Sequence, residues 1–150
     1  MPNIVENELT VSGDEESIGQ FKDLIGGAKN FSLEKILPTP QKLLDDNPTY
    51  HTKEDMDKNY PPEWYTWRMQ HWGVKWDIGD CELITDSFEN PSDHFISYKF
   101  TSAWNPPLIA LERLSKEIPE LKIELGYFEP MNDISGHCIM KNGEADFKFQ

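Results

Sequence analysis

Residues 60–77, YPPEWYTWRMQHWGVKWD, contain four of the five tryptophans of the chain: Trp64, Trp67, Trp72 and Trp76. Pro61 and Pro62 favour a helix start, because proline fixes φ and lacks only an N–H group that would be unpaired there. Gly73 is typical of the position just past a helix end. The stretch therefore predicts one helix that starts at the prolines and ends at Gly73.

The large rings of this helix recur at spacings of four, three and four, at Tyr60, Trp64, Trp67 and His71. This spacing places them on one helix face. Burying each large side chain contributes roughly 1.5–3 kcal/mol, so we expect the helix to pack against a small sheet. In the alternative interpretation some rings line an exposed groove for a partner or ligand, since Trp and Tyr are common in binding hot spots.

The composition fits one folded domain over residues 1–150. The chain is 37% hydrophobic and 12% aromatic, which is typical of a protein with a buried core and a polar surface. No apolar run approaches the roughly 20 residues needed to span a bilayer, and the start lacks a basic-then-apolar leader. We therefore expect a cytoplasmic protein that makes no membrane contact.

Charge is the strongest compositional feature. Twenty-seven acidic residues against fourteen basic ones give a net charge of −13. Such a surface repels phosphate groups, so direct binding of nucleic acid is disfavoured, and it attracts basic proteins. An acidic surface is also an ordinary route to solubility.

The rest of the chain alternates between strand and helix patterns. Residues 4–11 alternate with period two, and Ser12 to Glu15 has the spacing of a capping box for a helix that Gly26-Gly27 ends. We further expect a short strand or extended lead-in at 31–37, a helical turn at 41–44 and a turn at 45–48. Strands at 81–85 and 94–101 would be joined by a turn-rich connection at 86–93. A helix at 106–118, a strand at 121–127 and a hairpin of 134–140 with 146–149 around Asn142-Gly143 would follow. Asn105 is placed to cap the 106–118 helix, with Pro106 at its first position.

This order of elements predicts an α+β fold with ferredoxin-like topology. The antiparallel sheet would carry helices on one face, and a C-terminal β-hairpin would extend it. Residues 38–79 would form a Trp-rich helical insertion that packs back on the sheet.

Five short strings occur in one order along nearly the whole chain. They are residues 1–13 (MPNIVENELTVSG), 35–40 (KILPTP), 71–77 (HWGVKWD), 100–107 (FTSAWNPP) and 126–130 (GYFEP) followed by Gly136. Taken together they resemble the YubB-type ferredoxin-like domain family, a family of unknown function carried by phages and plasmids. The resemblance implies a mobile-element protein in a bacterial host cell and transfers no catalytic residues. His71, where the family usually has Asn, and Ser102 depart from its pattern.

Candidate chemistry gathers around the end of the Trp-rich stretch. Asp77 is the best candidate for acid–base work, because a carboxyl beside aromatic rings can have a raised pKa. A cap or turn role is the alternative that we favour for it. His71, Asp80 and Cys81 lie nearby, and His137-Cys138 could approach them, but no metal-binding spacing occurs. Two isolated cysteines, Cys81 and Cys138, are expected to be free thiols. We expect no metal and no cofactor.

The sequence is best interpreted as a binding protein, not an enzyme. The candidate contact residues are Trp64, Trp67, Trp72, Trp76, Asp77 and Trp104, although we expect Trp104 to pack over the sheet edge. The expected partner is a basic host or phage protein, and a DNA-mimicking inhibitor is the most concrete form of this hypothesis. The alternative is a small-ligand protein or enzyme with a pocket between the Trp-rich helix and the sheet. A homo-oligomer that covers an exposed sheet edge is also possible.

Overall fold

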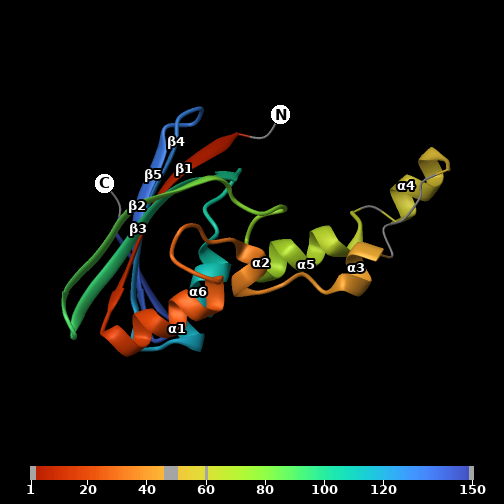
Figure 1. Cartoon of the computed structure of the whole chain (residues 1–150). Helices are drawn as coiled ribbons and strands as arrows, with labels where there is room; N and C mark the ends of the chain where they lie inside the picture. The colour runs from red at the N-terminus through yellow and green to blue at the C-terminus, as the bar shows by residue number, and fades with distance from the viewer. Residues whose placement is uncertain (1–2, 46–50, 60, 149–150) are drawn as a thin grey trace.

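Strand β1 (Ile4–Gly13) lies in the middle of a six-stranded antiparallel sheet (Figure 1). The computed structural model describes residues 3–45, 51–59 and 61–148. The sheet order is β2-β3-β1-β4-β5-β6, and the other strands are β2 (Gly79–Asn90), β3 (Asp93–Ala103), β4 (Lys122–Glu129), β5 (Ile134–Lys141) and β6 (Glu144–Lys148). The α+β class with an antiparallel sheet is thereby confirmed.

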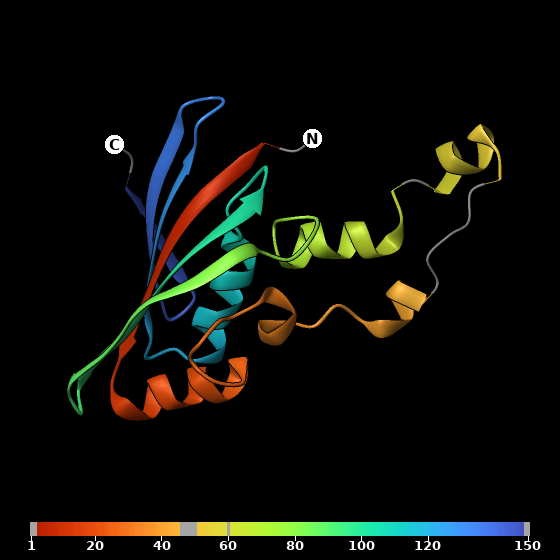
Figure 2. The same cartoon turned by 45° about the horizontal axis from the view of Figure 1, so that its top comes forward.

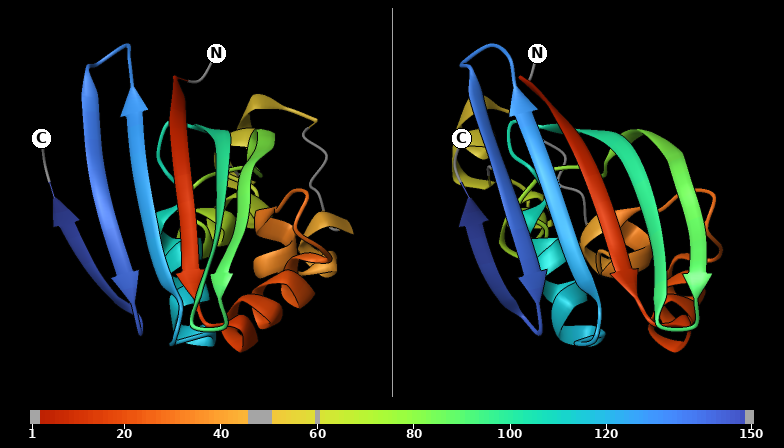
Figure 3. Two further views of the ribbon diagram at one scale, coloured as in Figure 1. Left: turned by 60° about the vertical axis from the view of Figure 1, so that its left-hand side comes forward. Right: turned by 90° about the vertical axis from the view of Figure 1, so that its left-hand side faces the viewer.

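In the described part of the chain, the helices lie on one face of this sheet (Figure 3). The helices are α1 (Glu15–Ile25), α2 (Leu33–Ile36), α3 (Gln41–Asp45), α4 (Lys53–Asn59), α5 (Glu63–His71) and α6 (Leu108–Glu117). Helices α1 and α6 direct Ile18, Phe21, Leu111 and Leu114 into the core. On β1, Val5, Leu9 and Val11 face these helices, whereas Glu6 and Glu8 face solvent on the open side, as the period-two pattern predicts. No helix in the described part of the chain is long and apolar enough to cross a membrane.

The helix predicted in residues 60–73 exists as α5, but it does not pack on the sheet. Helix α5 has no fully buried residue and contacts α3 and α6, not a strand. Figure 2 shows α3, α4 and α5 extending away from the sheet as an arm. The expectation that 38–79 packs back on the sheet holds for the end of the segment. Among its described residues, Trp72 and Val74 are buried in the core and Trp67 and Ile78 pack against it, whereas α3 and α4 extend away (Figure 2). Tyr60 and residues 46–48 of the predicted turn lie outside the described residues.

Two predicted helix starts differ from the structure. The N-cap of α1 is Asp14, whose carboxylate accepts a hydrogen bond from the Ser17 amide at 2.8 Å, so Ser12 is not the cap and still belongs to β1. Helix α6 begins at Leu108 after Pro107, with no side-chain cap. Asn105 is not the cap, because it lies in a tight turn that ends three residues before the helix.

Two segments predicted from local pattern adopt another structure. Residues 33–36 form the short helix α2, not a strand, because Ser32 and the distant Asp77 accept hydrogen bonds from its first amides.

The second segment is the connection predicted at 86–93, which continues as strand to Asn90. There Asp86 receives hydrogen bonds from His94 at 2.7 Å and Lys22 at 3.1 Å. Burial raises the pKa of Asp86, but these bonds and the nearby charges outweigh burial and hold that pKa below its ordinary value.

The C-terminal hairpin agrees with its prediction. Strands β5 and β6 pair around Asn142 and Gly143, whose φ angles of 54° and 77° are those that the Asn-Gly turn requires. The Gly143 amide donates to Ser115 Oγ at 2.8 Å, which ties the turn to α6. The hairpin thus extends the sheet beyond β4.

Gly136 in β5 supplies a first test of this packing. A Cβ atom at this position would overlap the hydroxyl and ring of Tyr127 on the paired strand. We expect Gly136→Ala to lower the free energy of unfolding by about 1–3 kcal/mol, the usual cost of overpacking. Urea denaturation measures the change. The control is Gly126→Ala in β4, where no atom lies within 4 Å of the added Cβ. Equal stability of the two variants would contradict this packing.

Candidate functional site

The five tryptophans divide into buried and exposed residues. Trp72 is fully buried, and Trp67 is partly buried against the core. Trp64 is of intermediate burial, whereas Trp76 and Trp104 are 42% and 49% exposed. The candidate contact residues predicted from the sequence therefore do not form one exposed surface.

Trp72 anchors the arm to the core. Its indole Nε1 donates a hydrogen bond to the Leu37 carbonyl at 2.8 Å, and its own carbonyl accepts one from the Ala110 amide at 3.3 Å. The ring also meets Trp67 edge-on, with centroids 6.0 Å apart. These contacts connect α5, the segment after α2, and α6. Trp72 is therefore a structural residue and not a contact residue for a partner.

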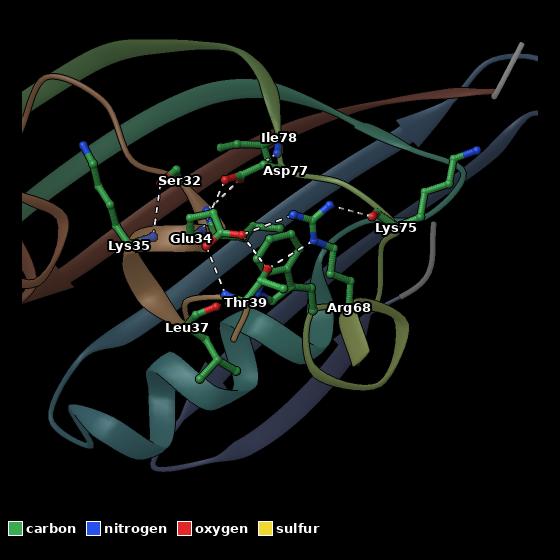
Figure 4. A network of polar contacts seen from close by, with 11 residues as sticks. Ser32, Glu34, Lys35, Leu37, Thr39, Arg68, Lys75, Asp77 and Ile78 are labelled. Carbon is green, nitrogen blue, oxygen red and sulfur yellow. Dashed lines mark hydrogen bonds and ion pairs between the residues drawn. The ribbon is translucent and has the colours of Figure 1, made fainter. Parts of the chain in front are cut away.

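Arg68 strengthens the same junction (Figure 4). Its guanidinium lies 5.0 Å from the Trp64 ring centre and 4.9 Å from that of Trp72, within the range of cation–π attraction. It also donates to Thr39 Oγ1 at 3.1 Å and pairs with Glu34 at 3.4 Å. The Trp64 ring thus already has a cation–π partner, Arg68, within the protein.

Asp77 acts as a cap and not as a base in a pocket. Its carboxylate accepts hydrogen bonds from the amides of Leu33 at 2.8 Å, Glu34 at 3.2 Å and Ile78 at 2.8 Å (Figure 4). The two α2 amides are among those that a helix start leaves unpaired. The cap alternative is correct, but Asp77 caps a helix 44 residues earlier in the chain.

The other residues predicted as candidates for metal binding or catalysis do not form one site in the described part of the chain. Within residues 3–45, 51–59 and 61–148, no three His, Cys, Asp or Glu side chains are placed to hold a metal ion. His71 is stacked on Trp67 with ring centres 4.4 Å apart, and its Nδ1 bonds the Trp67 carbonyl. Cys81 and Cys138 are free thiols, and burial raises the pKa of each above its ordinary value. Both thiols are therefore poor nucleophiles at neutral pH.

Trp104 is held in an uncommon backbone conformation. Its φ is 70°, and the Asn105 amide donates to the Ala103 carbonyl at 2.8 Å across it. A positive φ at the centre of such a three-residue turn is rare and strained, and for a bulky side chain it costs on the order of 1–3 kcal/mol. We call residues 103–105 the Trp104 turn. Trp104 is 49% exposed, so half of its side chain faces solvent, and packing of the other half over the sheet edge stays a prediction.

A chain of hydrogen bonds fixes the Trp104 turn. Asn7, which is 2% exposed, donates from Nδ2 to Ser102 Oγ at 3.0 Å, and Ser102 Oγ donates to the Asn105 carbonyl at 2.6 Å. The Trp104 amide donates to the Asn3 carbonyl at 2.8 Å. No functional role of Asn7 was predicted from the sequence. The one signal for Asn7 in the sequence is that a polar residue stands at a position of β1 whose period-two pattern predicts burial.

A small cleft separates the Trp104 turn from the arm. Its volume is about 210 Å³, and its lining residues are Tyr65, Met69, Lys75, Ala103, Trp104 and Asn105. This volume is below the roughly 300 Å³ that is usual for small-molecule sites. Beside the cleft, Lys75 Nζ lies 4.2 Å from the centre of the exposed Trp76 ring. Trp104 lines this cleft, and Trp76 follows the lining residue Lys75 in the chain. Both rings are exposed, and we call them the exposed tryptophan pair.

Comparison with known proteins gives a similarity of fold alone. No protein-family profile and no curated protein matches the chain. The crystal structure of a protein, api92, from Yersinia pseudotuberculosis, assigned to family DUF1281, is similar with a TM-score of 0.63. The sequence identity is 11%, and the match covers 100% of this chain and 98% of that one. The whole chain therefore shares an architecture with a solved protein.

The role of Asp77 can be tested by removing its carboxylate. We expect Asp77→Ala to lower the free energy of unfolding by about 0.5–2 kcal/mol, since the α2 amides lose their cap. Asp77→Asn keeps one side-chain oxygen and should lose less. Denaturant unfolding monitored by tryptophan fluorescence compares the three proteins. An Asp77→Ala variant as stable as the wild type would show that the cap is unimportant.

Proposed function

We propose that this domain binds another protein, and that the exposed tryptophan pair, Trp76 and Trp104, is the centre of the contact surface. The observation that carries this proposal is the Trp104 turn. A strained turn persists only where its surroundings hold it, and such strain is concentrated at functional sites. Here a buried polar chain from Asn7 through Ser102 supports a turn whose effect is to expose an indole ring.

Tryptophan is well suited to this role. It is among the residues that contribute most to protein interfaces, often with 2 kcal/mol or more lost on truncation. The cleft beside Trp104 could accept one side chain of a partner, because its walls combine the aromatic and thioether groups of Tyr65 and Met69. A thioether adapts its shape to the group that it contacts.

The net charge favours a basic partner. A charge of −13 would attract a basic protein over long range and accelerate its association. On the open sheet face, Glu8 pairs with Lys99 at 3.4 Å and Glu124 with Lys122 at 2.8 Å, so these two carboxylates are already neutralised within the protein. The proposal therefore rests on a basic partner and not on a DNA-like arrangement of charges on this face.

The ferredoxin-like topology is compatible with a protein-binding domain. The order β1, α1, β2, β3, α6, β4 and the neighbours β2-β3-β1-β4 are those of a ferredoxin-like domain, to which β5 and β6 add a hairpin. We infer that topology, with the predicted Trp-rich insertion of residues 38–79 between α2 and the start of β2. The resemblance to the YubB-type family supports an accessory protein of a mobile element.

The pocket alternative has less support. The cleft at the Trp104 turn is small, and no carboxylate is among its lining residues in the described chain. Asp77 faces the amides of α2 instead. An oligomer that pairs edge strands remains an alternative for β2, but this edge carries three register irregularities, a feature that discourages strand addition.

Capture experiments with matched variants test the proposal. Trp104→Gly removes the ring and suits a positive φ, so we expect unchanged or higher thermal stability together with at least a tenfold loss of partner binding. Phe88→Ala, at an equally exposed ring on the β2–β3 hairpin, is the control. The immobilised proteins are incubated with lysate of the host cell and eluted with rising salt.

The proposal requires a protein that wild type and Phe88→Ala retain and Trp104→Gly does not. Its release at moderate salt would agree with attraction by charge, whereas retention in about 1 M salt would contradict the charge argument. The same captured proteins on all three samples would refute the assigned surface.

A further inference from the structure

The face of the sheet opposite the helices has a hollow of its own. It has a volume of about 690 Å³ and lies over β1, β3, β4 and β5. The side chains that project from this face around it include Glu6, Glu8, Lys99, Thr101, Phe128, Ser135 and His137. Figure 3 shows that no helix covers this side. We call this feature the sheet hollow.

Gly126 creates the depth of the sheet hollow. It lies opposite Glu8 on β1 and His137 on β5, in the inner part of the sheet. No atom lies within 4 Å of the place where its Cβ would be, so packing does not require a glycine there. A glycine inside a strand is unfavourable because of its backbone entropy and lack of a side chain. The fold does not require the empty space above Gly126, so a bound ligand group explains this space better.

The charges around the sheet hollow are not balanced. Glu8 is paired with Lys99 at 3.4 Å. Glu6 and Asp80 also line the hollow, and neither has an ion-pair partner among the described residues. Asp80 has a φ of 50° within a bulged part of β2. The hollow is therefore anionic and is suited to a cationic group.

Phe128 defines which cation fits best. It lies directly opposite Glu6 in the β1–β4 register and is 39% exposed. An aromatic ring beside a carboxylate suits guanidinium, which stacks on ring faces and pairs with carboxylate through two parallel hydrogen bonds. We propose that the sheet hollow binds an arginine side chain from a basic peptide segment of a partner protein.

Other occupants fit less well. Nucleic acid would be repelled by the carboxylates. A second copy of this chain, packed face to face about a two-fold axis, would bring equivalent acidic residues together, which is unfavourable. A width that spans four strands also exceeds what one free cation needs, so a peptide is the occupant that uses the whole hollow. This site is separate from the exposed tryptophan pair and does not depend on it.

NMR titration of the isotopically labelled 150-residue chain tests the site. The probe is the blocked tripeptide arginine-glycine-arginine, and the matched control replaces arginine by citrulline, which has nearly the same shape without the charge. We expect chemical-shift changes centred on Gly126, Phe128 and Ser135, and at least tenfold weaker binding of the citrulline peptide. Binding should also weaken as salt increases.

Three variants complete the experiment. Gly126→Val fills the hollow and should abolish binding while the melting temperature stays equal or increases. Glu6→Gln should weaken binding about tenfold, the usual effect of losing a charged hydrogen bond. Glu124→Gln lies on the same face, is already paired with Lys122 and does not line the hollow, so it should bind like the wild type.

Three results would overturn the proposal. They are equal binding of the arginine and citrulline peptides, undiminished binding by folded Gly126→Val, and shift changes that map elsewhere on the protein. Dimerisation of the protein alone, if it perturbs the same amides, would assign the hollow to a second copy instead. Loss of partner capture by Trp104→Gly would not alter any of these results, so the two sites can fail independently.

Discussion

The burial of Trp72 is the interaction on which the arrangement of this protein depends. Its ring lies where α5, α6 and the segment after α2 meet, and its Nε1 has a partner in the Leu37 carbonyl. A buried indole N–H without a partner would be costly, so this hydrogen bond fixes the position of the ring. From this anchor the arm extends away from the sheet (Figure 2), and the next tryptophan, Trp76, is exposed.

The two proposed contact surfaces both involve β1 and the last part of β3. On the helix side of β1, Asn7 holds Ser102 and thereby the Trp104 turn. On the open side, Glu6 and Glu8 border the sheet hollow. The period of two along one strand thus assigns alternate residues to two different tasks. A buried polar group and exposed carboxylates serve recognition in different ways, the first by positioning a ring and the second by direct contact.

Regular patterns allowed most of the fold to be predicted. The alternation of β1 and β3, the stripe of α6 and the Asn-Gly turn each depend on neighbours in the sequence. Helix α2 was not predicted, because Ser32 caps it locally but Asp77, which accepts hydrogen bonds from two more of its amides, is distant in the sequence. In the candidate site, Trp76 and Trp104 were predicted from the sequence as contact residues. The positive φ of Trp104 was not, because it contradicts the local backbone preference of tryptophan and depends on Asn7 and Ser102. The sheet hollow depends on three strands in register around Gly126, which no single segment encodes.

Fluorine NMR of protein labelled with fluorotryptophan tests the division of the tryptophans most directly. Five resonances are expected, and each is assigned by single Trp→Phe substitution. On transfer from H₂O to D₂O, exposed fluorines change chemical shift and buried ones do not. We predict the largest changes for Trp76 and Trp104 and none for Trp72. A solvent response at Trp72 equal to that of Trp104, or a Trp104 resonance without response, would contradict the account of a buried anchor and an exposed contact pair.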